Sequence, residues 1–411
     1  MKTTCLPAII RIFVVVLLAT GVSASSAARG LGIKAGEGRL HPSLDLDLVY
    51  DTNPSYASED VFSDLVLRIR PGIALSFPSE VVEFELEGKV GYDYFFGIDK
   101  KNNLSSVAGE ADMRLGFNPK GQVSFFIEDT FSRSSDPRYG AVSGRFDRTN
   151  NEAKAHLQIK PGGGALMFDL AYGFFIDWFD DSGSNSTALS NYGHRAYFSG
   201  KWKFLPKTAV TVDFDADIRR YPNSYTGGAK NSDVNAIRAT VGMLGQISPS
   251  IAITIKAGYG DTLLPSDNTG SDYRSAIGQA EMTFKSGTTF IQFGYSRNFQ
   301  PVVMFSYFGQ DRVYARLRQQ IAGKFTLALD ASYDYLAYGD DVTGDQQDGR
   351  TDHFVSGGLS FDYHIIDWIE VGLAYDIQAR ISGWQQVTAP GGSQDVDYNK
   401  HMFTLHIGVD Y

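Results

Sequence analysis

The chain has 411 residues, carries 37 Lys+Arg against 47 Asp+Glu, and has a formal net charge of −10 at pH 7. This acidic balance argues against nucleic acid as a partner, because binding to phosphates needs a basic face. The only cysteine, Cys5, lies in the N-terminal segment, so disulfides, thiolate metal sites and a cysteine nucleophile are excluded from the rest of the chain.

Residues 1–28 have the features of a secretory signal peptide. Two basic residues, Lys2 and Arg11, precede an apolar run at 12–19, and small residues with several candidate cleavage sites follow. The run is too short for a permanent membrane helix, although a signal anchor is the alternative interpretation. Cleavage would remove two positive charges and no acidic residue, so the net charge of −10 would become −12.

Beyond this segment the sequence alternates between apolar and polar residues almost without interruption, and no run approaches the roughly 20 apolar residues of a membrane helix. Successive side chains of a strand point to opposite faces, so alternation predicts strands with one apolar and one polar face. Eighteen such segments are predicted, at 41–53, 64–77, 81–96, 104–117, 122–132, 150–160, 165–179, 191–205, 208–220, 234–247, 251–262, 273–285, 288–299, 310–321, 325–338, 351–364, 368–383 and 399–411.

The predicted connections alternate between short turns and longer polar links. Eight are turns rich in proline and glycine, such as 206–207 and 286–287, and nine are longer links, such as 133–149. Short periplasmic turns alternating with longer outer loops are typical of an outer-membrane barrel. The expected fold is therefore all-β, a transmembrane antiparallel β-barrel of about 18 strands. Sixteen strands is the alternative, because 122–132 and 288–309 alternate less cleanly.

The last nine residues alternate without interruption. Phe403, Leu405, Ile407, Val409 and Tyr411 share one face, and polar or very small residues lie between them. A wholly apolar final strand face is typical of an outer-membrane barrel, where lipid covers it. We therefore expect a location in the bacterial outer membrane. The expected partners are outer-membrane lipid and the barrel-assembly machinery, which would interact through this C-terminal strand.

The four tryptophans are predicted to lie near the two rims of the barrel wall. Trp178 and Trp384 lie at the loop ends of their strands, and Trp202 and Trp368 lie near the turn ends. Aromatic girdles place rings at the two headgroup layers in this way, although ordinary packing is the alternative.

The expected domain organisation is a signal peptide at 1–28, a short periplasmic lead at 29–40 and an outer-membrane β-barrel at 41–411. The lead is too short for a plug domain, so a transporter that is driven through a plug is not expected.

A barrel of this size is too wide for its own side chains to fill, so an aqueous lumen is expected. Its wall is predicted to carry opposite charges on neighbouring strands, with Asp45 and Asp47 beside Arg68 and Arg70, and these beside the glutamates at 83–87. Cross-strand pairing that stiffens the wall and a ring that selects permeants are both open interpretations. The lumen-lining candidates are Asp45, Asp47, Arg68, Arg70, Glu83, Glu85, Glu87, Arg114, Lys201, Lys203, Asp213, Asp215, Asp217, Arg312, Arg316 and Arg318.

Two basic groups among these candidates favour contact with an anion. They are the Lys201 and Lys203 pair and the row of Arg312, Arg316 and Arg318.

Catalytic motifs are not found. The sequence has no G-x-S-x-G elbow and no H-E-x-x-H, so no catalytic residue, cofactor or metal site is expected, and the chain is not expected to be an enzyme. The acidic loop at 340–348 lacks the spacing and the closing glutamate of a calcium loop, which favours a solvated outer loop.

The first two predicted strands resemble the opening of the β-barrel porin 2 family. Residues 40–54 contain a proline-bearing strand and the rim Tyr50-Asp51-Thr52-Asn53, and residues 63–75 contain Arg70-Pro71-Gly72. Several members of that family resemble outer-membrane components of exopolysaccharide secretion. The resemblance implies an exit channel for polysaccharide, with periplasmic export components as partners. A general diffusion porin for small hydrophilic solutes and a structural or lipid-modifying barrel with a closed lumen are the alternatives.

Overall fold

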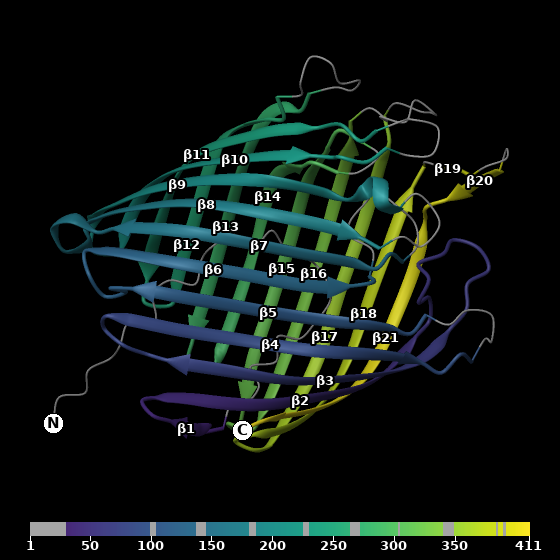
Figure 1. The fold of residues 1–411 in the computed structure, drawn as a ribbon, viewed down its shortest axis with the longest axis horizontal. Helices are drawn as coiled ribbons and strands as arrows, with labels where there is room; N and C mark the ends of the chain where they lie inside the picture. Colours follow the sequence, from purple (N-terminus) through teal and green to yellow (C-terminus); the bar gives the residue numbers. More distant parts are fainter. Residues whose placement is uncertain are drawn as a thin grey trace.

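The computed structural model describes residues 30–98, 104–136, 145–180, 186–224, 230–263, 272–302, 305–339, 349–383, 385–388 and 392–411. Eighteen antiparallel strands close into one barrel, as the alternation predicted (Figure 1). The helical elements of the described chain are two short 3₁₀ turns, Pro161–Gly164 and Ser186–Leu189. No described helix is long and apolar enough to cross a membrane.

Each of the eighteen predicted segments is a strand, including the less regular ones near 122–132 and 288–299. The barrel strands are β2 (Gly38–Asp51), β3 (Asp64–Phe77), β4 (Val82–Phe95), β5 (Ser106–Phe117), β6 (Val123–Ser134), β7 (Arg148–Ile159), β8 (Leu166–Phe179), β9 (Asn191–Leu205), β10 (Thr208–Arg220), β11 (Val234–Ser248), β12 (Ile251–Asp261), β13 (Arg274–Ser286), β14 (Thr289–Gln300), β15 (Phe308–Ile321), β16 (Phe325–Tyr338), β17 (Thr351–Ile366), β18 (Ile369–Ser382) and β21 (Tyr398–Asp410).

Three short strands were not predicted. β1 (Ile33–Ala35) pairs with the beginning of β2, so part of the stretch expected to be a short periplasmic lead forms a hairpin with the first barrel strand. β19 (Gln385–Thr388) and β20 (Gly392–Asp395) form a separate hairpin in the last long loop. Strands of three or four residues are too short to show a period of two residues above chance, which explains why the sequence did not reveal them.

The barrel closes where β2 pairs with β21, from Ser43 opposite Asp410 to Asp51 opposite Met402. This seam leaves none of the barrel strands with an unpaired edge. Three contacts between ionisable side chains cross it, and they are spread along its length. His41 Nδ1 lies 4.0 Å from Asp410, His406 Nδ1 lies 2.5 Å from Asp47, and Lys400 Nζ lies 2.7 Å from Asp51.

The two faces of the wall differ as the sequence predicted. On β21, Phe403, Leu405 and Ile407 are 51%, 47% and 39% exposed, and the polar residues between them point to the opposite face. The same exposed apolar face continues on the neighbouring strands, for example at Leu373. A soluble single chain rarely exposes a continuous apolar surface of this extent, which indicates that the outer wall meets an apolar environment.

The connections divide the barrel into two different ends. Short turns gather at one end, which lies to the left in Figure 1, and the longer links gather at the other. We call these the turn end and the loop end.

Candidate functional site

Charged side chains on the inner face of the wall are held by contacts between strands. Lys89 on β4 donates to Asp45 on β2 at 2.8 Å, and Arg195 on β9 donates to Glu152 on β7 at 2.8 Å. Arg238 on β11 reaches Asn298 on β14 at 3.1 Å. Each contact passes over at least one intervening strand. Side chains converge in this way on the concave side of a curved sheet, so these polar residues share the inner face.

The predicted charge pairing between β2 and β3 is present in the register. Asp45 lies opposite Arg70, and Asp47 lies opposite Arg68. Direct opposition of unlike charges stabilises a strand pair modestly, by roughly 0.2–1 kcal/mol.

The predicted pairing of Arg68 and Arg70 with the glutamates of β4 is wrong. The turn between β3 and β4 sets Phe77 opposite Phe84, so Glu85 and Glu87 lie opposite Ser76 and Ala74 instead. Both arginines approach Asp93 of β4, at 3.6 Å for Arg68 and 3.7 Å for Arg70. Counting charges in neighbouring segments could not find this partner, because the hairpin register decides which residues meet.

Arg114 on β5 is the cation beside the glutamates of β4. Its guanidinium lies 3.6 Å from Glu83 and 3.9 Å from Glu128 of β6, and in the register it stands opposite Glu85. The guanidinium also covers the ring of Phe126 at 4.3 Å. A carboxylate on either side and an aromatic face hold this side chain against the wall.

The aspartate row on β10 is neutralised by cations from three other strands. Lys256 donates to Asp213 at 2.8 Å, Arg238 donates to Asp215 at 2.6 Å, and Arg195 donates to Asp217 at 3.3 Å. The interpretation as wall-stiffening pairs therefore fits this row better than an uncompensated acidic ring.

Two arginines of the basic row on β15 pair with aspartates of β16. Arg312 lies opposite Asp334 and 3.3 Å from it, and Arg316 lies opposite Asp330 and 3.2 Å from it. Arg318, the next inward residue, lies opposite Ala328.

The Lys201 and Lys203 pair lies near the turn end of β9. In the register Lys201 stands opposite Met167 and Thr211, neither of which is a carboxylate. The backbone N–H of Lys203 donates to the carbonyl of Ala165 at 2.8 Å.

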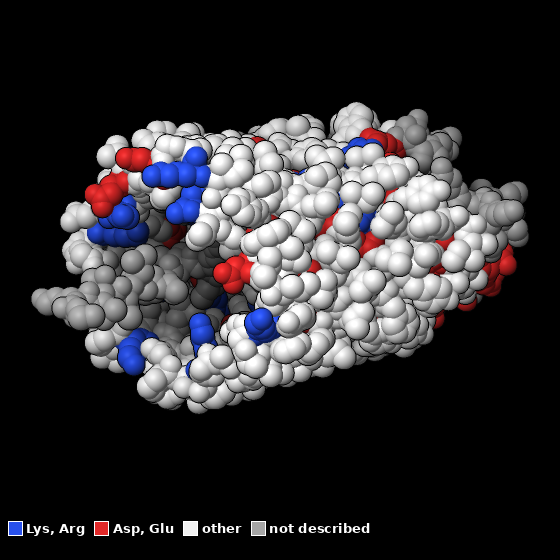
Figure 2. Space-filling view, turned by 90° about the horizontal axis from the view of Figure 1, so that it is seen from below, with Lys and Arg blue, Asp and Glu red and all other residues white. Residues whose placement is uncertain are grey.

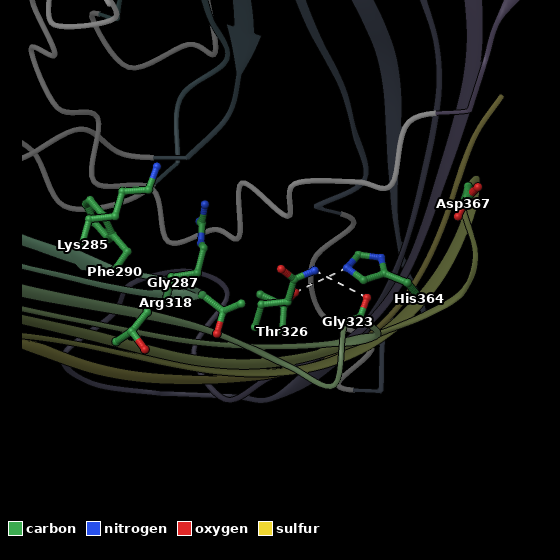
Figure 3. A pocket seen from close by; sticks show the side chains of 11 residues that line it. Lys285, Gly287, Phe290, Arg318, Gly323, Thr326, His364 and Asp367 are labelled. Carbon is green, nitrogen blue, oxygen red and sulfur yellow. Dashed lines mark hydrogen bonds between the residues drawn. The ribbon is translucent and has the colours of Figure 1, made fainter. Parts of the chain in front are cut away.

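A hollow of about 550 Å³ lies at the turn end, where the turns after β13, β15 and β17 meet (Figure 3). Figure 2 shows the molecule hollowed at this end, with Lys and Arg side chains around the opening and some Asp and Glu side chains among them. The lining combines the cations Lys285 and Arg318 with the ring of Phe290. His364 and Thr326 close one side of it, with 3.4 Å between His364 Nε2 and Thr326 Oγ1. The remaining lining residues are Gly287, Thr288, Thr289, Gln320, Gly323 and Asp367.

Residues of the links pack over the inner face at the loop end, and we call these residues the loop cap: Tyr56, Arg145, Phe305 and Val396. Tyr56 is 8% exposed and meets the ring of Tyr398 edge-on at 5.3 Å, so the link after β2 bends over the inner face of β21. Phe305 and Val396 are buried in one apolar cluster.

Arg145 joins two links of the loop cap. Its guanidinium donates to the carbonyl of Pro54 at 3.5 Å and lies 3.3 Å from Asp136. Burial alone would raise the pKa of Asp136, but Arg145, followed by Lys400 and the two arginines of β3, outweighs it and lowers that pKa. Burial, followed by the nearby charge of Asp136, raises the pKa of Tyr56 well above its ordinary value, so this phenol stays neutral.

Three of the four tryptophans can be placed. Trp178 and Trp202 are 53% and 55% exposed on the outer face near the loop end and the turn end of their strands, and Trp368 lies in the turn after β17. Trp384, the predicted signal peptide and the acidic loop at 340–348 lie outside the described residues. The aromatic girdle stays a prediction.

No group of three or more His, Cys, Asp or Glu side chains in the described part of the chain could hold a metal ion. The inner face instead offers ion pairs, a basic hollow and a packed loop end, an arrangement that can bind or select solutes.

Comparison with known proteins gives the fold. No protein-family model and no curated protein matches the sequence. The barrel is similar to the crystal structure of Pseudomonas aeruginosa OpdK with vanillate, at a TM-score of 0.51 and 9% identity, covering 90% of this chain and 99% of that one. It is also similar to Pseudomonas aeruginosa OpdQ, at a TM-score of 0.48 and 10% identity, covering 92% of this chain and 100% of that one. At these identities the similarity to OpdK concerns the barrel fold alone.

Proposed function

We propose that the chain is a pore of the bacterial outer membrane and performs no chemical step of its own. The observation that supports this most is the closed eighteen-stranded wall, with its exposed apolar outer face and charged inner face. A barrel of this strand number leaves an aqueous channel unless loops obstruct it. In this proposal the lumen-lining candidates face water and influence which solutes pass.

The favoured role is an exit channel for secreted polysaccharide, with outer-membrane lipid, the assembly machinery and periplasmic export components as partners. This role rests on the resemblance of residues 40–54 and 63–75 to the β-barrel porin 2 family. A hollow with basic and hydroxyl-bearing side chains at the turn end is compatible with it, because a polymer would enter from the periplasm there.

Two alternatives remain open. A general diffusion porin would use the same wall for small hydrophilic solutes. A barrel with a closed lumen is favoured by one specific observation, the packing of the loop cap over the inner face.

The pore itself is tested by planar-bilayer recording of the purified, folded barrel. We expect discrete conductance steps. A folded barrel that never conducts, at any voltage, would leave only the closed-lumen alternative. Deleting the gene and measuring surface polysaccharide then separates the two pore roles, since unchanged export would leave the diffusion porin.

The membrane placement predicts the effect of a charge on the outer face. Leu405 lies midway along β21 between Leu48 and Leu373, and all three are exposed. We expect Leu405→Arg to lower the free energy of unfolding in lipid vesicles by about 2–4 kcal/mol, because a cation at mid-bilayer depth loses its hydration. Denaturant titration in vesicles measures this.

The matched control places the same residue in a turn. Glu80 is exposed between β3 and β4, so Glu80→Arg is expected to leave stability nearly unchanged. Equal stability of the two variants would contradict lipid contact at Leu405.

A further inference from the structure

We propose that a row of four side chains on the inner face is a pH-sensitive latch that fastens the seam of the barrel. The row, which we call the seam latch, consists of Asp47, His406, Glu370 and His364. Carboxylates and imidazoles alternate along it, and the two ring nitrogens of His406 each face a carboxylate. The latch would act on the closure of the wall, whatever solute the barrel admits.

The seam latch crosses four neighbouring strands, in the order β2, β21, β18 and β17. His406 Nδ1 on β21 lies 2.5 Å from Asp47 Oδ1 on β2, and its Nε2 lies 3.5 Å from Glu370 Oε1 on β18. His364 Nδ1 on β17 lies 3.3 Å from Glu370 Oε2. The first contact joins the last strand to the first, and the other two tie that joint to the strands before it.

Glycine makes room for the contact between His406 and Glu370. Gly408 lies opposite Glu370 in the register, two residues after His406 on the same strand. A Cβ atom at this position would lie 2.8 Å from His406 Nε2 and 3.1 Å from Glu370 Cγ. A larger residue there would push the two side chains apart, so the local sequence is suited to this diagonal contact.

The geometry of His406 requires an imidazolium. A neutral imidazole has one N–H group and one bare nitrogen, so it can donate to only one of the two carboxylates. The protonated ring donates to both. His364 differs, because its Nε2 lies 3.4 Å from the hydroxyl of Thr326, which can donate or accept (Figure 3). Either form of His364 fits, so His406 is the member of the latch that responds to pH.

Carboxylates predominate among the ionisable groups near His406 and its two partners. These groups are His41, Asp45, Asp47, Arg68, Arg70, Asp362, His364, Glu370 and Asp410. Asp45 accepts from Lys89 at 2.8 Å, and both arginines also approach Asp93. An imidazolium at His406 therefore has charges of opposite sign on the strands to either side of it.

The sign of the pH dependence follows from the two forms of the ring. The latch is complete while His406 carries both protons, and one of its contacts is lost when the ring gives up a proton. Its contribution to stability is therefore fully present below the ordinary histidine pKa of about 6.5 and is lost as the pH rises above that value. Water can reach the row, because both rings are partly exposed and His364 lines the turn-end hollow.

The test is denaturant unfolding of the barrel in lipid vesicles between pH 6 and pH 10, for the wild type and for His406→Gln. Glutamine offers an amide donor and a carbonyl acceptor at every pH, as the neutral ring does. We expect the ratio of the unfolding constant of the variant to that of the wild type to fall by at least about tenfold from pH 6 to pH 10. A ratio that stays constant would overturn the latch.

Two further variants separate charge from packing. His406→Arg places a permanent cation between the same carboxylates, so its stability is expected to vary less with pH than that of the wild type. His401→Gln is the matched control on the same strand, because His401 Nδ1 lies 2.8 Å from the hydroxyl of Tyr375 and not beside a carboxylate. Its ratio should not change with pH. An arginine variant as pH-sensitive as the wild type would place the response elsewhere.

A ¹⁵N spectrum of the wild-type barrel with labelled histidine tests the latch without a change in stability. The signals of His406 are assigned as those missing from either His406 variant. We expect both of its ring nitrogens to be protonated at pH 6 and one of them to lose its proton as the pH rises. A ring with a single proton at pH 6 would contradict the proposal.

Discussion

Replacing Lys400 by methionine is expected to lower the free energy of unfolding by about 3–5 kcal/mol, because the change leaves a buried carboxylate without its cation. Lys400 Nζ donates to Asp51 at 2.7 Å and to the carbonyl of Asn53 at 3.3 Å, and both charged side chains are 2% exposed. The ammonium also lies 3.9 Å from the ring centre of Tyr56. This contact joins the last strand to the first at the loop end of the seam.

The measurement is denaturant unfolding of the folded barrel in lipid vesicles. Asp51→Asn alone should lower the free energy of unfolding by a similar amount. The double variant Asp51→Asn/Lys400→Met should recover much of this stability, since replacing both partners of a buried pair is often close to neutral. Lys120→Met is the control, because Lys120 and Glu80 form a pair that is 73% and 82% exposed. Single variants as stable as the wild type would show that the seam does not depend on this pair.

Shortening the link after β2 is expected to raise single-channel conductance several-fold. Replacing residues 54–61 by a short Gly-Ser turn removes Tyr56 from Tyr398 and takes away the carbonyl of Pro54 that Arg145 contacts. The inner face at the loop end then loses side chains of the loop cap that pack over it. Glu59→Gln, an exposed change in the same link, is the control and should leave conductance unaltered.

The loop end of the barrel is also expected to open at low pH. The pKa of Asp136 is lowered from its ordinary value of 3.8 mainly because Arg145 outweighs the effect of burial. The pair therefore contributes fully above that value, and its contribution is lost as the pH falls below it. Conductance should rise below pH 3.8, and the rise should be smaller in Asp136→Asn. If neither the shortened link nor the drop in pH changes the conductance, the loop cap does not limit the current.

The strands could be predicted from the sequence because alternation is a local property. Even the weakly alternating segment near 122–132 forms β6, since its neighbours supply backbone partners on both sides. β1 and the β19–β20 hairpin were not predicted, because their strands are too short to show a detectable alternation.

Contacts were predictable only where local sequence sets them. Asp45 and Arg70 do lie opposite each other, but Arg70 approaches Asp93, because the turn between β3 and β4 shifts the glutamates away. The pair of Lys400 with Asp51 joins residues 349 positions apart, and a single sequence contains no pattern that identifies partners so far apart. The loop cap was not predicted either, because polar links have no sequence pattern that shows which of them fold inward.

The difference between the two ends of the barrel has an electrical consequence. In the proposed pore, an ion that arrives at the turn end meets the basic hollow first, whereas one that arrives at the loop end meets the loop cap first. A conduit whose two ends differ in charge in this way should rectify, so the current at one polarity should exceed the current at the other. An asymmetric current–voltage curve would then report which way each barrel has inserted into the bilayer.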